Sequence, residues 1–137
     1  MFSVDMDSPS KRWFYVNNTL QSMSYTNYSP NSMEFTPSDG WGVGATPTGS
    51  LKFDGTVSEF YFNPGFYIDL SDEVNRKRFL IGNRPANLGG NGYKPSGVQP
   101  LVYLSGLGDS LADNKGSGGS FSVNGSLSDY SGIVELP

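Results

Sequence analysis

The chain has no cysteine and no histidine among its 137 residues. These absences exclude disulfide bonds, thiolate nucleophiles, zinc sites built from cysteine and histidine, and catalytic triads in which imidazole is the base. Long apolar runs are also missing. None approaches the roughly 18 residues of a membrane span, and residues 1–10 lack the basic and apolar regions of a signal peptide. We therefore expect a protein that is not inserted in a membrane.

Positive charge is scarce. Nine basic residues stand against 13 acidic ones, for a formal net charge of −4. A nucleic-acid groove neutralises several phosphates with clustered Lys and Arg, so we expect no nucleic-acid partner. A few basic residues do lie close together in the sequence. They either form a short cationic patch for an acidic partner or, as we favour, mark a helix end: Arg76, Lys77, Arg78 and Arg84.

Patterns for catalysis and metal binding are weak. A glycosidase built on a β-sandwich places two acids on alternate residues of one strand, facing the same side. Only Asp5 and Asp7 have this spacing, near a chain end where no shaped cleft is expected. Asp109, Asp113 and Asn114 offer oxygen ligands for calcium, but without the spacing of an EF-hand loop, and a solvated loop is the favoured interpretation. We expect a non-enzymatic protein without a cofactor or metal.

Short aromatic or β-branched segments separated by Gly, Pro, Asn and Ser recur along the chain, whereas helical periodicity is scarce. This pattern predicts a single all-β domain over residues 1–137. The dipeptide Asn17-Asn18 predicts a hairpin turn. The expected strands are Met1–Met6, Arg12–Asn17, Gln21–Tyr25, Trp41–Ala45, Leu51–Asn63, Leu101–Leu104 and Phe121–Asn124.

One short helix is expected, at about residues 71–79. Asp69 or Ser71 can cap its N-terminus, acidic residues fill its first turn, and Arg76, Lys77 and Arg78 occupy its last turn, as the helix dipole prefers. The glycine-rich segments 82–106 and 105–120 lack the spacing of a phosphate loop and do not lie between a strand and a helix. We interpret them as successive surface turns and as a long connection across the end of a sandwich.

Aromatic side chains in loops are candidates for a glycan or a protein neighbour, because pyranose faces stack on such rings. Tyr25, Tyr28, Tyr93 and Tyr130 lie in expected loops or ends. Trp13 and Trp41 lie in apolar strand segments, and we expect both in the core.

Four segments resemble the C-terminal part of the laminin-G-like, concanavalin-A-like domains of tailed-phage and prophage proteins. They are "GTVSEFYF", "IDLSDEVNRKRF", "NLGGNGYKPSGVQPLVYLSG" and "NKGSGGSFSVNGSL", between Gly55 and Leu127. The resemblance implies a lectin-like jelly-roll β-sandwich. Domains of this type begin with several more strands than the present chain, so one sheet is expected to be narrow, with an exposed edge or face.

The resemblance further implies a bacteriophage structural protein of the virion, assembled in the host cytoplasm. Its expected role is capsid decoration or a place in a tail fibre, by adhesion to other virion proteins and to copies of itself. The alternative is a carbohydrate-binding module that recognises a host-surface glycan, which rests partly on analogy of fold. The expected contact residues are Tyr25, Tyr28, Tyr93, Arg76, Arg78 and Arg84.

Overall fold

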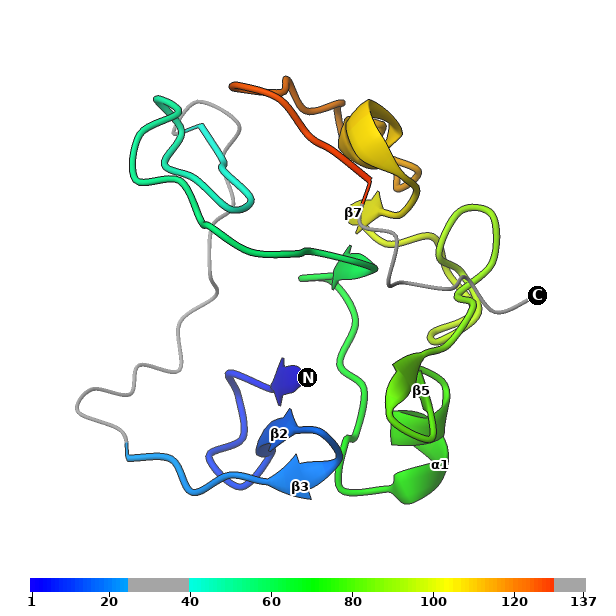
Figure 1. Ribbon diagram of the computed structural model, residues 1–137. Coiled ribbons are helices and arrows are strands. Elements are labelled where there is room, and N and C mark those ends of the chain that lie inside the picture. Colours follow the sequence, from blue (N-terminus) through cyan, green and yellow to red (C-terminus); the bar gives the residue numbers. More distant parts are fainter. Residues whose placement is uncertain (25–39, 130–137) are drawn as a thin grey trace.

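The computed structural model describes residues 1–24 and 40–129 (Figure 1). Within these ranges the regular structure consists mostly of short strands, with one α-helix and one 3₁₀ turn, which confirms an all-β fold with one short helix. The strands are few. The elements are β1 (Phe2–Val4), β2 (Arg12–Val16), β3 (Thr19–Leu20), β4 (Phe60–Phe62), α1 (Glu73–Lys77), β5 (Leu80–Ile81), β6 (Arg84–Pro85), β7 (Val102–Leu104) and η2 (Gly108–Ala112).

The first three strands form one antiparallel sheet in the order β1-β2-β3. Asn17 and Asn18 both have left-handed backbones, with φ of 48° and 62°, and join β2 to β3 as the two central residues of a tight turn. Asparagine tolerates this conformation better than other residues with a side chain. The predicted hairpin is therefore confirmed, and its tip lies beside α1 (Figure 1).

A second antiparallel pair joins strands far apart in the sequence, β4 and β7, with Tyr61 opposite Tyr103. The backbone N–H of Tyr103 donates to Asn114 Oδ1 at 2.9 Å, and its carbonyl accepts from the N–H of Lys115 at 2.9 Å. Opposite residues of an antiparallel pair exchange both backbone bonds or neither. Tyr61 therefore directs its backbone groups away from β7.

The helix is shorter than predicted and begins at a different cap. Asp72 is the N-cap, and its side chain accepts from the N–H of Val74 at 2.8 Å. The expected caps serve the preceding turn instead, where Asp69 Oδ1 accepts from both the N–H and the hydroxyl of Ser71. These two hydrogen bonds stabilise the ionised carboxylate and lower the pKa of Asp69. Asp69, Ser71 and Asp72 are all residue types that cap helices. Only Asp72 lies at the position where the helical backbone begins.

Several predicted strands are wrong. Gln21–Tyr25, as far as residue 24, Trp41–Ala45 and Phe121–Asn124 are not strands, and Leu51–Asn63 is reduced to β4. Leu51 and Glu59 have left-handed backbones, with φ of 51° and 53°, which interrupt an extended ladder. The segment 105–120, predicted as an irregular connection, contains η2.

The core is small and consists of two clusters that meet at the half-buried ring of Phe79. The first cluster has Tyr15, Ile68 and Leu70 against Trp13, so the expected burial of Trp13 is borne out in part. The second has Ala86, Leu88 and Tyr103 against Tyr61, whose ring meets Phe79 edge-on at 5.3 Å. Trp41 is 51% exposed, so its predicted place in the core is wrong.

Candidate functional site

The basic residues of α1 are engaged within the chain. The guanidinium of Arg76 donates to Asn18 Oδ1 at 2.7 Å, to the Leu70 carbonyl at 2.7 Å and to the Ser71 carbonyl at 2.9 Å. Lys77 pairs with Glu73 at 2.8 Å on the helix surface. The helix end therefore accounts for the positions of Arg76 and Lys77 without an external partner.

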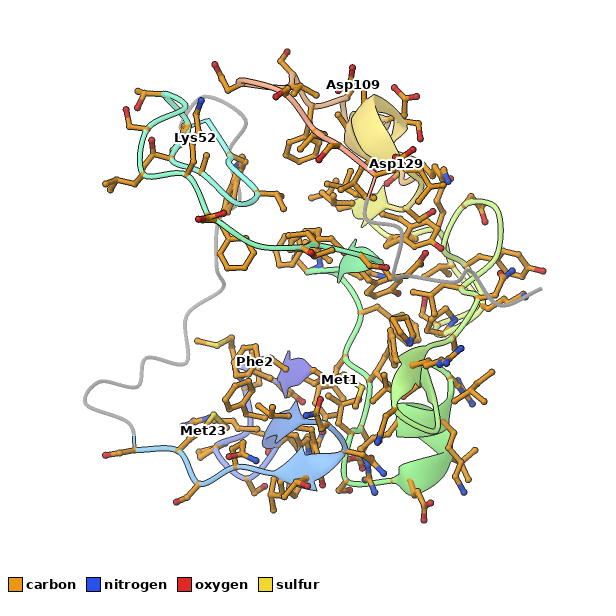
Figure 2. All side chains as sticks on the ribbon, in the orientation of Figure 1. Met1, Phe2, Met23, Lys52, Asp109 and Asp129 are labelled. Atoms are coloured by element: carbon orange, nitrogen blue, oxygen red, sulfur yellow. The ribbon has the colours of Figure 1, made fainter. Side chains whose placement is uncertain are left out.

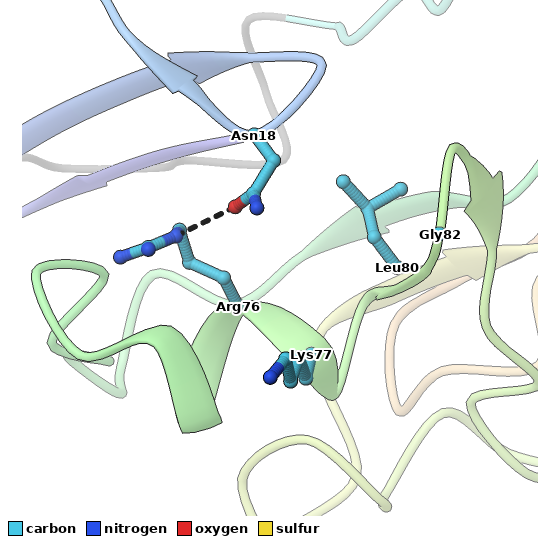
Figure 3. A pocket seen from close by; sticks show the side chains of 5 residues that line it. All are labelled: Asn18, Arg76, Lys77, Leu80 and Gly82. Atoms are coloured by element: carbon cyan, nitrogen blue, oxygen red, sulfur yellow. Dashed lines mark hydrogen bonds between the residues drawn. The ribbon is translucent and has the colours of Figure 1, made fainter.

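A small pocket lies beside Arg76, between α1 and the tip of the first hairpin (Figure 3). Its volume is ≈ 120 Å³, and its lining includes Asn18, Lys77, Leu80 and Gly82. Liquid water occupies about 30 Å³ per molecule, so this space suits a few waters rather than a sugar ring. The two charged groups in its lining already have partners within the chain, since Arg76 donates to Asn18, Leu70 and Ser71 and Lys77 pairs with Glu73. We therefore do not regard it as a ligand site.

The other predicted contact residues are dispersed. Arg78 donates to the Pro95 carbonyl at 2.8 Å, whereas Arg84 is exposed on β6. Tyr93 is 48% exposed on the glycine-proline segment, and its ring lies close to Gly89. Tyr25 and Tyr28 lie outside the described residues, as does Tyr130. Partner or glycan contact at these residues stays a prediction.

An open hollow of ≈ 1650 Å³ lies between segments 41–62 and 101–129, with part of 84–90 at one side. We call it the hollow. Trp41 and Phe62 approach each other on one wall, with ring centres 6.4 Å apart. Both walls carry large apolar side chains, and the sequence did not predict that these side chains lie near one another. They include Trp41, Phe53, Phe60, Phe62, Leu104, Leu107, Phe121, Val123 and Leu127.

Charges around the hollow are balanced. Its charged lining residues are three basic and three acidic: Lys52, Arg84, Lys115, Asp54, Glu59 and Asp129. Among the described residues the ion pairs are Asp5 with Lys11 and Glu73 with Lys77, so no pair joins charges of this lining. Lys52 and Asp129 lie on the two segments that border the hollow (Figure 2). The charges that line the hollow therefore sum to about zero.

A chain of polar contacts lines the inner side of the hollow. The hydroxyl of Tyr103 donates to Glu59 Oε2 at 2.6 Å, and Lys115 Nζ donates to Ser105 Oγ at 2.7 Å. Tyr103 and Ser105 are both almost fully buried. Burial, followed by the hydrogen bond to Glu59, raises the pKa of Tyr103 to about 12. The phenol is therefore a neutral donor at physiological pH, which suits a structural role.

Asn114 holds the glycine-rich segment against β7. Its side-chain oxygen accepts from the N–H groups of Tyr103 and Gly116 at 2.9 Å, and its amide donates to the carbonyls of Leu101 and Gly119 at 3.1 Å. A side chain with four backbone partners is not available as a calcium ligand. Within residues 1–24 and 40–129 no group of three acidic side chains has the arrangement of a metal site.

Comparisons with protein-family models, with curated proteins and with solved structures gave no match to this chain. Within the described ranges, no helix has the length and apolar character needed to cross a membrane. The interpretation of the hollow therefore rests on its own geometry and on the sequence resemblance.

Proposed function

We propose that this protein is a non-enzymatic structural component of a bacteriophage virion, with a jelly-roll-like sandwich that is completed by its neighbours. The observation that carries the proposal is the hollow, a broad concave surface whose lining includes large exposed apolar side chains such as Trp41, Phe53 and Leu127. In the part of the chain that the structure describes, seven hydrophobic residues are buried and fifteen large ones are exposed. Large exposed apolar surfaces are typical of protein–protein interaction sites. The four phage-type segments support a virion as the assembly concerned.

The adhesion would be driven by burial of side chains on the walls of the hollow. Phe53 is 60% exposed and Trp41 51% exposed, so a partner that covers them removes apolar area from water. Such burial contributes about 25 cal/mol per Å², before the entropic costs of association. Because the lining charges balance, a partner needs no strong charge of either sign.

Particles from a phage or prophage that carries this sequence test the proposal. Mass spectrometry of purified particles should detect the chain in stoichiometric amount. Phe53→Asp, in the hollow, should reduce its incorporation at least tenfold, whereas Val74→Asp should not, although Val74 is equally exposed on α1. Intact particles that lack the chain, or that incorporate Phe53→Asp normally, would contradict a virion role through the hollow.

Glycan recognition is the second candidate function, and Trp41 favours it. An indole that is half exposed beside phenylalanine rings and polar groups is the type of surface on which a pyranose stacks. Host-surface glycan should then quench tryptophan fluorescence, and Trp41→Ala or Tyr28→Ala should abolish binding without changing incorporation into particles. If no host glycan binds at millimolar concentration, this alternative fails.

A further inference from the structure

The asparagine side chains of the described residues differ in how firmly they are held. Five of the nine take part in hydrogen bonds within the chain: Asn18, Asn63, Asn75, Asn87 and Asn114. The other four have no hydrogen bond from the side chain among residues 1–24 and 40–129: Asn17, Asn83, Asn91 and Asn124. An amide that no hydrogen bond holds can turn toward the backbone of the next residue, so chemistry at the side chain is confined to these four.

The whole chain has two Asn-Gly pairs, Asn91-Gly92 and Asn124-Gly125, and both asparagines belong to this second group. Asparagine is a thermolabile residue, because the backbone nitrogen that follows it can attack the carbon of its side-chain amide. A following glycine favours the attack, since it has no Cβ to hinder the approach. From the sequence alone the two pairs are equivalent.

The structure distinguishes the two pairs at the attacking nitrogen. Gly92 is buried, its N–H donates to the Gly89 carbonyl at 3.3 Å, and a Cβ at this position would lie 2.9 Å from Cγ of Tyr103. This backbone cannot turn toward the Asn91 side chain unless the segment opens. Gly125 is exposed, and its N–H has no hydrogen bond with any residue that the structure describes. Its nitrogen is therefore accessible both to water and to the neighbouring amide.

We propose that Asn124 is the main site of spontaneous deamidation in the folded chain. The Gly125 nitrogen loses its proton to solvent base and bonds to Cγ of Asn124. The bond from Cγ to Nδ2 breaks, and the amide nitrogen takes up a proton and leaves as ammonia. Water then adds to either carbonyl of the resulting succinimide and breaks its C–N bond, which gives aspartate or isoaspartate. The only reactant besides the chain is water.

The reaction changes a contact between the two walls of the hollow. A Cβ on Gly49 would lie 2.6 Å from Cγ of Asn124, and a Cβ on Gly125 would lie 3.1 Å from Lys52 Nζ, so these positions from segments 41–62 and 101–129 touch. Lys52 has no ion pair within the described ranges. Deamidation adds a carboxylate beside it and one negative charge to the formal −4 of the chain. Isoaspartate also inserts a methylene into the main chain at this contact.

Peptide mapping by mass spectrometry tests the proposal on the purified full-length chain, incubated in water at neutral and at mildly alkaline pH. Electron-transfer fragmentation identifies aspartate and isoaspartate at each position. We expect deamidation at Asn124 to be about tenfold faster than at Asn91 or more, because reaction at Asn91 requires local opening of a buried segment. The rate at Asn124 should rise with pH, since the attacking nitrogen must first lose its proton.

The chain unfolded in urea at the same pH is the control for the effect of the fold. Both Asn-Gly pairs are then accessible, so Asn91 and Asn124 should deamidate at similar rates. Similar rates at the two positions in the folded chain would overturn the proposal. So would a folded chain in which Asn124 stays intact while it reacts in urea.

Two matched variants provide a second measurement, anion-exchange chromatography of the intact protein. Glutamine keeps the amide but needs a less favourable six-membered ring, and both positions are exposed, so Asn124→Gln and Asn91→Gln should fold normally by circular dichroism. The more acidic form should accumulate in the wild type and in Asn91→Gln, and most of it should be absent from Asn124→Gln. An undiminished acidic form in Asn124→Gln would overturn the proposal. Neither measurement needs a partner, so the outcome is independent of the proposed virion role.

Discussion

The guanidinium carbon of Arg76 lies 4.5 Å from the centre of the Tyr15 ring, which joins the end of α1 to the middle of β2. The same side chain donates to Asn18 at the hairpin tip and to the Leu70 carbonyl before the helix. Tyr15 and Leu70 belong to one buried cluster. Arg76 thus connects the N-terminal sheet to the helix, and its guanidinium is used in contacts within the chain.

Arg76→Lys should destabilise the protein by about 2 kcal/mol, because an ammonium cannot reach Asn18, Leu70 and Ser71 at once or stack as a plane on Tyr15. Urea unfolding followed by circular dichroism measures the loss. Lys77→Ala is the matched control. Its pair with Glu73 is exposed, so the change should stay within about 0.5 kcal/mol. Equal effects of the two changes would show that Arg76 does not connect hairpin and helix.

Asn114→Asp should destabilise the protein by about 2 kcal/mol although it preserves the shape of the side chain. The change keeps an acceptor for the N–H groups of Tyr103 and Gly116 but removes the two donors to Leu101 and Gly119, and it places a carboxylate against both carbonyls. Asp113→Asn, next in the chain and exposed, is the control and should have little effect. The readout is again urea unfolding, with calcium absent and then present. A rise in stability with calcium for the wild type would contradict our exclusion of Asn114 as a ligand.

The parts of the fold that the sequence predicted well are those determined by neighbours along the chain. Asn17 and Asn18 form a turn because both accept a left-handed backbone, and α1 ends in basic residues because its own carbonyls favour them. The ends of β4 could not be predicted in this way. Glu59 has a left-handed backbone, which cannot be predicted from a glutamate in the sequence. Its side chain accepts a hydrogen bond from Tyr103, 44 residues away.

The candidate site depends even more on distant contacts. Trp41 lies in an apolar segment that suggested a buried strand, yet burial requires a partner strand that the described part of the chain does not supply. The hollow combines Trp41 and Phe53 with Leu127, and no local pattern announces that these segments face each other. The position of Tyr93 in a loop was predicted from the residues next to it in the sequence, and its side chain is exposed in the structure.

Gly92→Ala should destabilise the protein by about 2 to 3 kcal/mol. The backbone of Gly92 is left-handed, with φ of 76°, and an added Cβ would lie 2.9 Å from Cγ of the buried Tyr103 and 3.0 Å from Cγ of Pro100. Gly90 is the control, because a Cβ there meets nothing within 4 Å and its backbone is not left-handed. Thermal melts of Gly92→Ala and Gly90→Ala compare a position where glycine is required with one where it is not. Equal melting temperatures would contradict a structural reason for Gly92.

The stability of the protein should fall as the pH rises from about 10 through about 12, because of Tyr103. An unfolded tyrosine loses its proton near pH 10, whereas burial and the bond to Glu59 raise the pKa of Tyr103 in the folded protein to about 12. Between these values the folded state holds a proton that the unfolded state has released, so its contribution is fully present below pH 10 and lost above pH 12. A difference of about two pKa units corresponds to about 2 to 3 kcal/mol.

Urea unfolding of the wild type and of Tyr103→Phe at several pH values between 9 and 12 isolates this contribution, since other groups that titrate in the same range are common to both proteins. Tyr103→Phe should be less stable at pH 9, because Glu59 loses its donor, and its stability should depend less steeply on pH. Tyr93→Phe, at an exposed ring, should follow the wild-type curve. Phenolate absorbance of the folded wild type gives an independent reading, since Tyr103 should lose its proton well above pH 10. Parallel curves for the wild type and Tyr103→Phe would mean that Tyr103 is not held neutral by the fold, and the polar chain from Glu59 to Lys115 would then lose its structural interpretation.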